Sequence, residues 1–253
     1  MSQDAAHLVQ ASNRGESSMR STAALAPAPH SSPSTPEVVA AALRDEVLDG
    51  LLPPGARLRE EGLCERFGVG RHSARAALRL LVAAGLVVHE RHRGATVRPL
   101  SRARIDESFD FRLALELGSL RLALARDADL TPVELAVQEL EALPAHTPWR
   151  QLTECHGRIH HEIVRAAGNE RLLAAYRSCE DELQLLFAVI RLDFSAQRLA
   201  RLHRQLVDAL RLGGEVALQA LEDDLERSGR AAVLHALARS EAGLAAAAGG
   251  AAR

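Results

Sequence analysis

The chain has 253 residues, of which 47% are hydrophobic and 25% charged, and its formal net charge of −2 at pH 7 is typical of a globular protein with room for two modest domains. No apolar run is long enough to span a bilayer, and the first residues lack the pattern of a secretory signal, so we expect a cytoplasmic protein without a membrane partner. The three cysteines are scattered, which argues against a disulfide framework and against a thiolate zinc site.

The N-terminal residues 1–35 are rich in Ser, Ala and Pro and have no periodic apolar pattern. Such a segment cannot bury enough apolar surface to offset the entropy lost on ordering, so the sequence predicts a disordered tail. A helix is expected to begin at Ser34 or Thr35, either of which can cap it, and to end at Gly50. Four of its apolar residues share one face: Val39, Leu43, Val47 and Leu48.

Two short helices, Glu60–Phe67 and Arg71–Ala84, are expected next, separated by a tight Gly-Val-Gly turn. This order is the helix-turn-helix pattern. Its expected core consists of Leu63, Phe67, Val69, Leu78 and Leu81. Two β-rich runs follow, Leu86–Val88 and Ala95–Val97, and their polar connection indicates a small hairpin, or wing. The sequence therefore predicts a winged helix-turn-helix domain over residues 36–100.

The composition and pattern of the sequence change in residues 101–240, where Leu, Ala, Arg and Glu recur at helical spacing. This pattern predicts six or seven helices and no strand. The last residues, 241–253, are expected to form a flexible tail. The predicted fold class is mainly α, with an N-terminal winged helix-turn-helix and its β-hairpin wing, followed by a C-terminal all-α helical bundle.

Basic charge is concentrated in the predicted winged helix. From Arg66 to Arg98 there are seven arginines and a single acidic residue, Glu90, whereas the remainder of the chain is acidic. A basic segment in an otherwise acidic chain indicates local contact with a polyanion, which favours double-stranded DNA. The second helix of a helix-turn-helix enters the major groove with its N-terminal residues. The expected DNA-binding residues are Arg71, His72, Ser73 and Arg75 on that helix, and Arg93 and Gly94 at the wing.

The stretch LRDEVLDGLLPPGARLREEGLCERFGVGRHSARAALRLLVAAGLV, followed by RGATVRPLS, resembles the winged helix of the GntR family of bacterial transcription regulators. The resemblance covers about residues 37–101. It implies a sequence-specific regulator that reads a near-palindromic operator as a homodimer. Ser73 stands where many relatives have proline and Ala76 where many have glutamate, so the operator sequence does not follow from the family.

The second half resembles the FCD domain of the FadR branch of that family, from about Ser101 to Leu237. FRLALELGSLRLALA matches its first helix, in which an Arg-x-x-x-Glu pair is usual, here Arg112 and Glu116. IHHEIVRAAGNERLL and LHRQLVDALRLGG resemble two segments that carry histidines. The resemblance implies a domain that binds a small organic-acid effector, with Arg112 holding a carboxylate oxygen. Pairing of Arg112 with Glu116 alone is the other interpretation.

In many FCD domains one aspartate and three histidines hold a divalent metal. By resemblance, His160 and His203 fall on metal histidines and His156 falls on the aspartate. Asp224 takes the place of the last histidine if the alignment has a gap after Gly214; without that gap Leu225 stands there and the fourth ligand is absent. Three histidines and one aspartate would suit zinc, nickel, iron or manganese.

The residues themselves leave alternatives open. His156 and His160 lie one turn apart on a helix and can bind one ion together, but such a pair can also be an ordinary hydrogen-bonded pair. His161 points to another side and is expected to be solvated or to pack on a neighbour. A metal-sensing regulator and a metal-free pocket for an acyl or apolar ligand remain alternatives. A metal-dependent enzyme is disfavoured, because no general base or phosphate-binding glycine loop accompanies the histidines.

Overall fold

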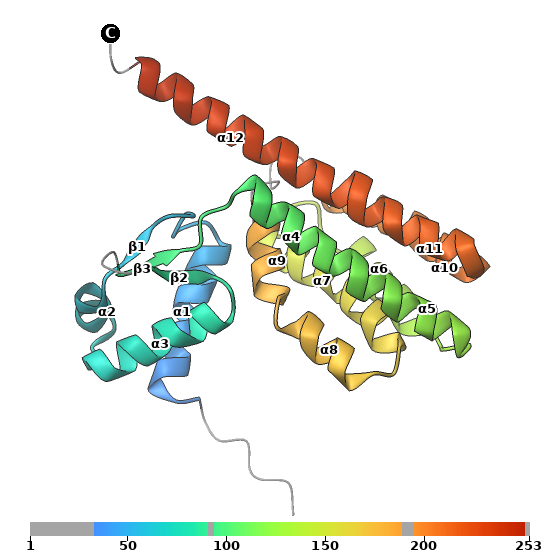
Figure 1. The fold of residues 1–253 in the computed structure, drawn as a ribbon, viewed down its shortest axis with the longest axis horizontal. Helices are drawn as coiled ribbons and strands as arrows, with labels where there is room; N and C mark the ends of the chain where they lie inside the picture. Colours follow the sequence, from blue (N-terminus) through green and yellow to red (C-terminus); the bar gives the residue numbers. More distant parts are fainter. Residues whose placement is uncertain (1–32, 91–93, 189–194, 251–253) are drawn as a thin grey trace, which may run out of the picture. The chain divides into compact units, whose positions relative to one another are not determined.

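The computed structural model describes residues 33–90, 94–188 and 195–250, whose elements are shown in Figure 1. In these residues the chain is mainly α-helical, with one small antiparallel sheet, which confirms the predicted fold class. Most of the predicted N-terminal tail and the wing residue Arg93 lie outside the described residues. Within them, no helix is both long enough and apolar enough to cross a bilayer.

The first helix, α1 (Thr35–Leu48), begins at a capping box. The side chain of Glu37 accepts a hydrogen bond from the backbone N–H of Ser34 at 2.6 Å, and Pro36 occupies the first turn, where a missing N–H costs nothing. The predicted apolar face is buried: Val39, Leu43, Val47 and Leu48 are each less than 5% exposed. This face packs on α3 and forms the centre of the winged-helix core.

The helix-turn-helix consists of α2 (Glu60–Phe67) and α3 (Arg71–Ala83). Gly68 ends α2 in the left-handed conformation, with a φ of +62°, which glycine adopts without steric cost. Ala74 and Ala77 of α3 are fully buried, so the two helices and α1 approach closely. Of the expected core residues Leu63, Leu78 and Leu81 are buried, whereas Phe67 and Val69 are half-buried and only border the core.

The sheet has three strands, one more than the sequence predicted. The hairpin strands are β2 (Val87–Glu90) and β3 (Gly94–Val97), and β1 (Arg57–Leu58) pairs with β3 on its other side. The strand β1 has two residues and follows a Pro-Pro-Gly turn, so it lacks the length needed for a recognisable alternation. Its Arg57 lies opposite Thr96 of β3.

The rest of the described chain is helical. Its elements are α4 (Arg102–Arg112), α5 (Gly118–Ala125), α6 (Thr131–Glu141), α7 (Trp149–Ala166), α8 (Glu170–Arg177), α9 (Glu180–Ala188), α10 (Ala196–Leu212), α11 (Gly214–Asp223) and α12 (Ala231–Gly250). Two π-helical turns join consecutive helices without a break: η1 (Leu113–Leu117) between α4 and α5, and η2 (Asp224–Arg230) between α11 and α12. Counted this way, the described residues after the winged helix contain seven continuous helical segments.

The helix α12 continues to Gly250, through residues that the sequence assigned to a flexible tail beginning at 241. Alanine has the highest intrinsic helix propensity, and the run AAAA extends the helix without needing an apolar face. The composition that suggested fraying is therefore equally suited to a helix.

Two apolar clusters form the interior of the helical half. One is built mainly from α5, α6, α7, α10 and α11, and the other from α4, α8, α9 and α12. The helix α9 also contributes Leu185, which is 1% exposed, to the winged-helix core. The long helices α7 and α10 carry the predicted histidines between these clusters.

Candidate metal centre and DNA-binding surface

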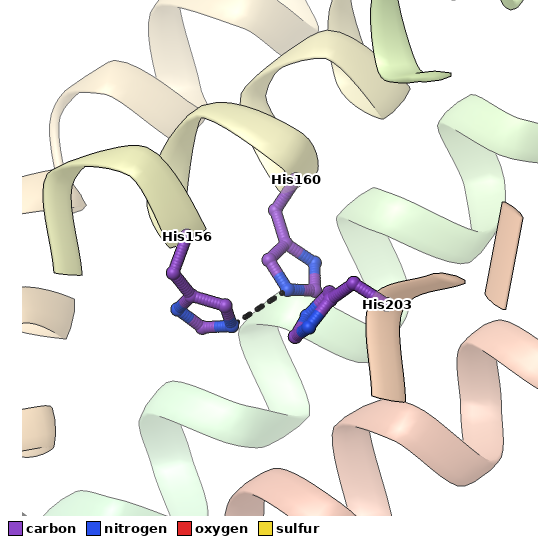
Figure 2. A group of neighbouring side chains, drawn as sticks. All are labelled: His156, His160 and His203. Atoms are coloured by element: carbon purple, nitrogen blue, oxygen red, sulfur yellow. Dashed lines mark hydrogen bonds between the residues drawn. The ribbon is translucent and has the colours of Figure 1, made fainter. Parts of the chain in front are cut away.

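Three of the predicted ligands, His156 and His160 on α7 and His203 on α10, lie together in the interior. They are 6%, 1% and 2% exposed, and each offers a donor atom within 4.8 Å of the other two. Figure 2 shows the three rings turned toward one another, and its dashed line joins the Nε2 atoms of His156 and His160, 3.3 Å apart. The spacing of four residues on α7 and the packing of α7 near α10 bring these donors to one point.

Hydrogen bonds at Nδ1 orient two of the three rings. Nδ1 of His160 lies 2.8 Å from Oε2 of Glu116, and Nδ1 of His203 lies 2.8 Å from the carbonyl oxygen of Leu199. Because a carbonyl and an ionised carboxylate only accept hydrogen bonds, both rings carry the proton on Nδ1. Their Nε2 lone pairs are therefore directed to the centre of the cluster. In the described part of the chain Nε2 of His203 is buried without any hydrogen-bond partner.

Asp224, at the start of η2, lies beside two of the three histidines. Its Oδ2 lies 3.6 Å from Nε2 of His160 and its Oδ1 lies 3.8 Å from Nε2 of His203. Leu225 is fully buried in the apolar core instead. The carboxylate thus lies beside the histidines, as in the alignment that has a gap after Gly214.

Both π-helical turns place a carboxylate beside the histidines, Glu116 in η1 and Asp224 in η2. A π-helical turn holds one extra residue, which rotates the side chains that follow it, and such turns often mark functional sites. The sequence could not predict them, because their residues have ordinary helical character. Glu116 was named as the partner of Arg112, but its contact with His160 was not foreseen.

Burial determines the electrostatics of the cluster. Desolvation, together with the neighbouring His203 and His160, lowers the pKa of His156 well below its usual value, so the free ring is neutral and one of its two nitrogens keeps a lone pair. Burial also lowers the pKa of His203. Burial opposes ionisation of Glu116, but the charge of Arg112 and the hydrogen bond from His160 outweigh it and hold the pKa of Glu116 below its usual value.

Arg112 lies on the other side of Glu116, at the end of α4. It is 2% exposed, and its Nε donates to Oε1 of Glu116 at 2.7 Å. Its guanidinium also lies 5.4 Å from the ring centroid of Phe109 and 5.8 Å from that of Phe187. The predicted pairing with Glu116 is present, and Arg112 also borders the cavity beside the histidines.

Two cavities meet at the cluster. A small one of about 20 Å³ is lined by the histidines, Asp224 and Arg112 among other residues, and has room for one ion or one water molecule. A larger one of about 290 Å³ extends from His156 and His160 along α7 to α9, past Gly157 and Gln184. Oε1 of Gln184 is buried without a partner among the described residues. The larger cavity has the size expected for a small organic ligand.

The donor set fits a divalent transition metal. Imidazole nitrogens and a carboxylate oxygen are ligands that such ions accept, and an Nδ1 fixed by a carboxylate or a carbonyl is the usual support of a metal-binding histidine. His161, on another side of α7, is directed to Glu180, with 2.7 Å between Nδ1 and Oε1. It packs on a neighbour and stays outside the group.

The predicted DNA-binding residues lie along the first turns of α3. Arg71, His72 and Arg75 are exposed and Ser73 is half-buried. Gly94 opens β3 with a φ of +81° and has no atom near the position of a Cβ, so a phosphate could approach its backbone closely. A hollow of about 310 Å³ joins Arg71 to Gly94 and is also lined by Arg57, Arg59 and His89. Arg57 and Arg59 are not among the predicted residues, because they precede the segment from Arg66 to Arg98 in which basic charge is concentrated.

Two exposed arginines of α3 are paired with the start of α2. Nε of Arg75 donates to Oε1 of Glu60 at 3.1 Å and its Nη2 donates to Oε2 at 2.9 Å. Nη2 of Arg71 makes a single longer contact of 3.4 Å with Glu61. The two acids neutralise part of the charge that the sequence alone ascribed to this surface.

Comparison with protein families gives two matches along the chain. Residues 35–97 match the model described as bacterial regulatory proteins of the gntR family, and residues 107–223 match the FCD domain. The first match covers the winged helix, and the second includes His156, His160 and His203 and ends at residue 223, one residue before Asp224.

Individual proteins show the same relationship. The chain is 32% identical over 216 residues, which are 83% of its length and 93% of the relative's, to a probable D-xylose utilization operon transcriptional repressor of Paenarthrobacter nicotinovorans. It is 37% identical over 154 residues, 60% of its length and 63% of the relative's, to the gluconate operon transcriptional repressor of Bacillus licheniformis. A crystal structure of a GntR transcriptional regulator from Rhodococcus sp. RHA1 matches with a TM-score of 0.67 and 29% identity, covering 80% of this chain and 99% of that one.

Proposed function

Because the chain belongs to the GntR family of bacterial regulatory proteins and carries an FCD domain, we propose that its affinity for an operator is controlled by a small organic acid bound at a divalent metal. Like its relatives, the chain is a DNA-binding transcription regulator and not an enzyme. The observation that carries the proposal is the buried cluster of three histidines beside Asp224, whose ring nitrogens lie around a space for one ion. We assign the chain to the FadR branch, as its FCD domain suggests.

The proposed ligands of the metal are His156, His160, His203 and Asp224. When bound, the ion would supply a Lewis acid with open coordination positions for an anionic ligand. Glu116 and the carbonyl of Leu199 hold two of the rings in the tautomer that a metal requires. Zinc, nickel, iron and manganese are all compatible with this donor set.

Arg112 is the proposed partner of the effector carboxylate. It uses its Nε toward Glu116, and charge-assisted contact with a second anion would engage its remaining N–H groups. The names of two relatives refer to D-xylose and to gluconate, which favours a hydroxylated acid as the class to test first. The larger cavity, with the unpartnered Gln184 Oε1 as a hydrogen-bond acceptor, supports a ligand that carries hydroxyl groups.

An acyl or apolar ligand is less well supported. The cavity beside the histidines is bordered by the charged groups of Arg112 and Asp224, which favour an anionic or metal-bound ligand over an apolar chain. A regulator that senses the metal alone would have the same ligands and would respond without any acid.

The helix α9 is the proposed route from the effector to the DNA-binding half. The ring of Phe187 packs edge-on against His156, with centroids 5.0 Å apart. Leu185 packs in the winged-helix core. Oδ1 of Asp181 accepts a hydrogen bond from Nε of Arg44 of α1, with 2.7 Å between the two atoms. This nine-residue helix thus contacts both the histidine cluster and the core of the winged helix. We propose that a bound effector shifts α9 and changes the spacing of the recognition helices in a homodimer on a near-palindromic operator.

The test measures operator affinity by fluorescence anisotropy while metal-loaded protein is titrated with a panel of small carboxylates. We expect one class of acid to change the affinity, by about five-fold or more if the coupling is typical of allosteric proteins. The response should be lost in Arg112→Met and retained in Arg211→Met, whose guanidinium pairs with Glu134 and Asp208 on the surface, away from both cavities. Saturating ligand that binds the protein but leaves operator affinity unchanged would contradict the proposal.

A further inference from the structure

The pair formed by Arg75 and Glu60 has the geometry of a two-pronged clamp. Two parallel hydrogen bonds, of 3.1 Å from Nε and 2.9 Å from Nη2, join the guanidinium to both carboxylate oxygens. Such bidentate pairs fix the plane of the guanidinium as well as its position. The other end of the guanidinium, formed by Nη1 and the second hydrogen of Nη2, makes no hydrogen bond with the residues that the structure describes.

The carboxylate is held in place by the helix-turn-helix itself. Glu60 is the first residue of α2, which is anchored in the core through the buried Leu63 and joined to α3 by the turn at Gly68. The side chain of Glu60 is 32% exposed and that of Arg75 is 60% exposed. The hydrogen bond from Arg75 lowers the pKa of Glu60, so the carboxylate is ionised at neutral pH.

We infer that Glu60 is a positioning residue for DNA reading: it holds Arg75 by its Nε edge so that the free end of the guanidinium meets the O6 and N7 atoms of a guanine. A guanidinium oriented before binding loses less side-chain entropy when it contacts a base, and its planar fork matches guanine. Glu60 therefore raises sequence specificity, although its negative charge lowers attraction to phosphate. The inference concerns DNA recognition and is independent of the proposed metal and effector.

A different role would have the opposite consequence. If Glu60 merely neutralised Arg75 until DNA displaced it, removing its charge would strengthen binding to every sequence equally. The neighbouring pair does not have the clamp geometry, since Arg71 and Glu61 share one contact of 3.4 Å and their side chains are 73% and 77% exposed. Arg71 can thus reach a phosphate, and of these two arginines Arg75 is the one that is oriented.

The experiment compares two duplexes of equal length: one selected from random DNA by binding to the full-length parent protein, and a scrambled version of it. The variants are Glu60→Gln, Arg75→Lys, the two combined, and Glu65→Gln, which removes an exposed charge from the same helix. The readout is the ratio of the affinities for the two duplexes, at one fixed salt concentration. Thermal unfolding followed by circular dichroism checks that each variant is folded, and Glu60→Asp provides a second variant.

We expect Glu60→Gln to lower the ratio by about ten-fold, the loss of part of one bidentate base contact, while affinity for the scrambled duplex is unchanged or increased. Glu60→Gln should add little to Arg75→Lys, because lysine has no fork to orient. Glu65→Gln should leave the ratio as in the parent. An unchanged ratio in Glu60→Gln, an equal gain on both duplexes, or full additivity with Arg75→Lys would overturn the inference.

Discussion

Oε2 of Glu116 accepts a hydrogen bond from Nδ1 of His160, with 2.8 Å between the two atoms, and both side chains are at most 1% exposed. The same carboxylate accepts from Arg112 through its other oxygen. One buried group therefore connects the proposed ligand histidine to the proposed effector-binding arginine. The π-helical turn η1 is what places Glu116 between them.

This relationship predicts the effect of Glu116→Gln. The amide keeps the shape of the side chain but no longer balances the buried charge of Arg112, and its NH₂ group can face either partner. We expect metal affinity to fall by about 10- to 100-fold, the usual effect of losing such a support. Breaking a buried ion pair should also lower the free energy of unfolding by roughly 3–5 kcal/mol.

Chelator competition measures the first effect, and thermal unfolding of the metal-free protein measures the second. Glu139→Gln is the matched control, since Glu139 pairs with Arg158 on the surface, where their side chains are about half exposed. Metal affinity equal to the parent's in Glu116→Gln would show that Glu116 does not orient His160.

Adding one methyl group at each of two helical glycines should have opposite effects on the free energy of unfolding. A Cβ added at Gly229 in η2 would lie 2.8 Å from Cε1 of the fully buried Phe109, whereas a Cβ at Gly157 in α7 would meet nothing within 4 Å. Gly229→Ala should destabilise the fold by roughly 1–3 kcal/mol through overpacking. Gly157→Ala should stabilise it by up to about 1 kcal/mol through helix propensity. Denaturant unfolding of both variants checks the pair, and a stable Gly229→Ala would refute the packing of η2 on Phe109.

The basic surface predicts a steep dependence of DNA affinity on salt. Each arginine that contacts a phosphate releases counterions, so the slope of log K against log salt should be several units in the parent. Arg71→Ala should reduce the slope by about one unit with similar losses on all sequences. Measuring the affinity at salt concentrations from about 50 to about 300 mM checks this. Around 0.1 M the screening length is about 10 Å, so screening changes markedly over this range. A flat response of the parent would remove the DNA-binding role from this surface.

The contacts of α9 predict a variant that binds effector but responds weakly. Asp181→Asn weakens the partly exposed pair with Arg44, so the free energy of unfolding should change by less than about 1 kcal/mol. If α9 carries the signal, the effector-induced change in operator affinity should shrink while effector affinity is kept. Asp208→Asn, which removes an exposed charge paired with Arg211, is the control. An unaltered response in Asp181→Asn would exclude this contact from the route.

The sequence predicted best what repeats along the chain. The apolar periodicity of α1 and α3, the glycine turn between α2 and α3, and the alternating strands of the wing are local patterns, and the structure contains all of them. The strand β1 was missed because two residues carry no periodicity, and its pairing with β3 depends on residues far along the chain.

The site was harder to predict than the fold. The spacing of His156 and His160 indicates a shared helix face, but nothing local relates them to His203 or to Asp224. That relation came from the resemblance to FCD domains, and the position of Asp224 depended on a gap in the alignment. The role of Glu116 toward His160 required the tertiary structure, because a π-helical turn determines where its carboxylate lies.

The most direct test of the metal centre is the metal content per subunit of tag-free protein, measured for the parent, Asp224→Ala and Asp223→Ala. Asp223 is the neighbouring acid and instead pairs with Arg227, so it is a matched control. The account predicts about one equivalent of zinc, nickel, iron or manganese in the parent and in Asp223→Ala, and much less in Asp224→Ala. Absence of metal from the parent after all four ions have been offered would contradict it, and His156 and His160 would then be ordinary residues of a helix.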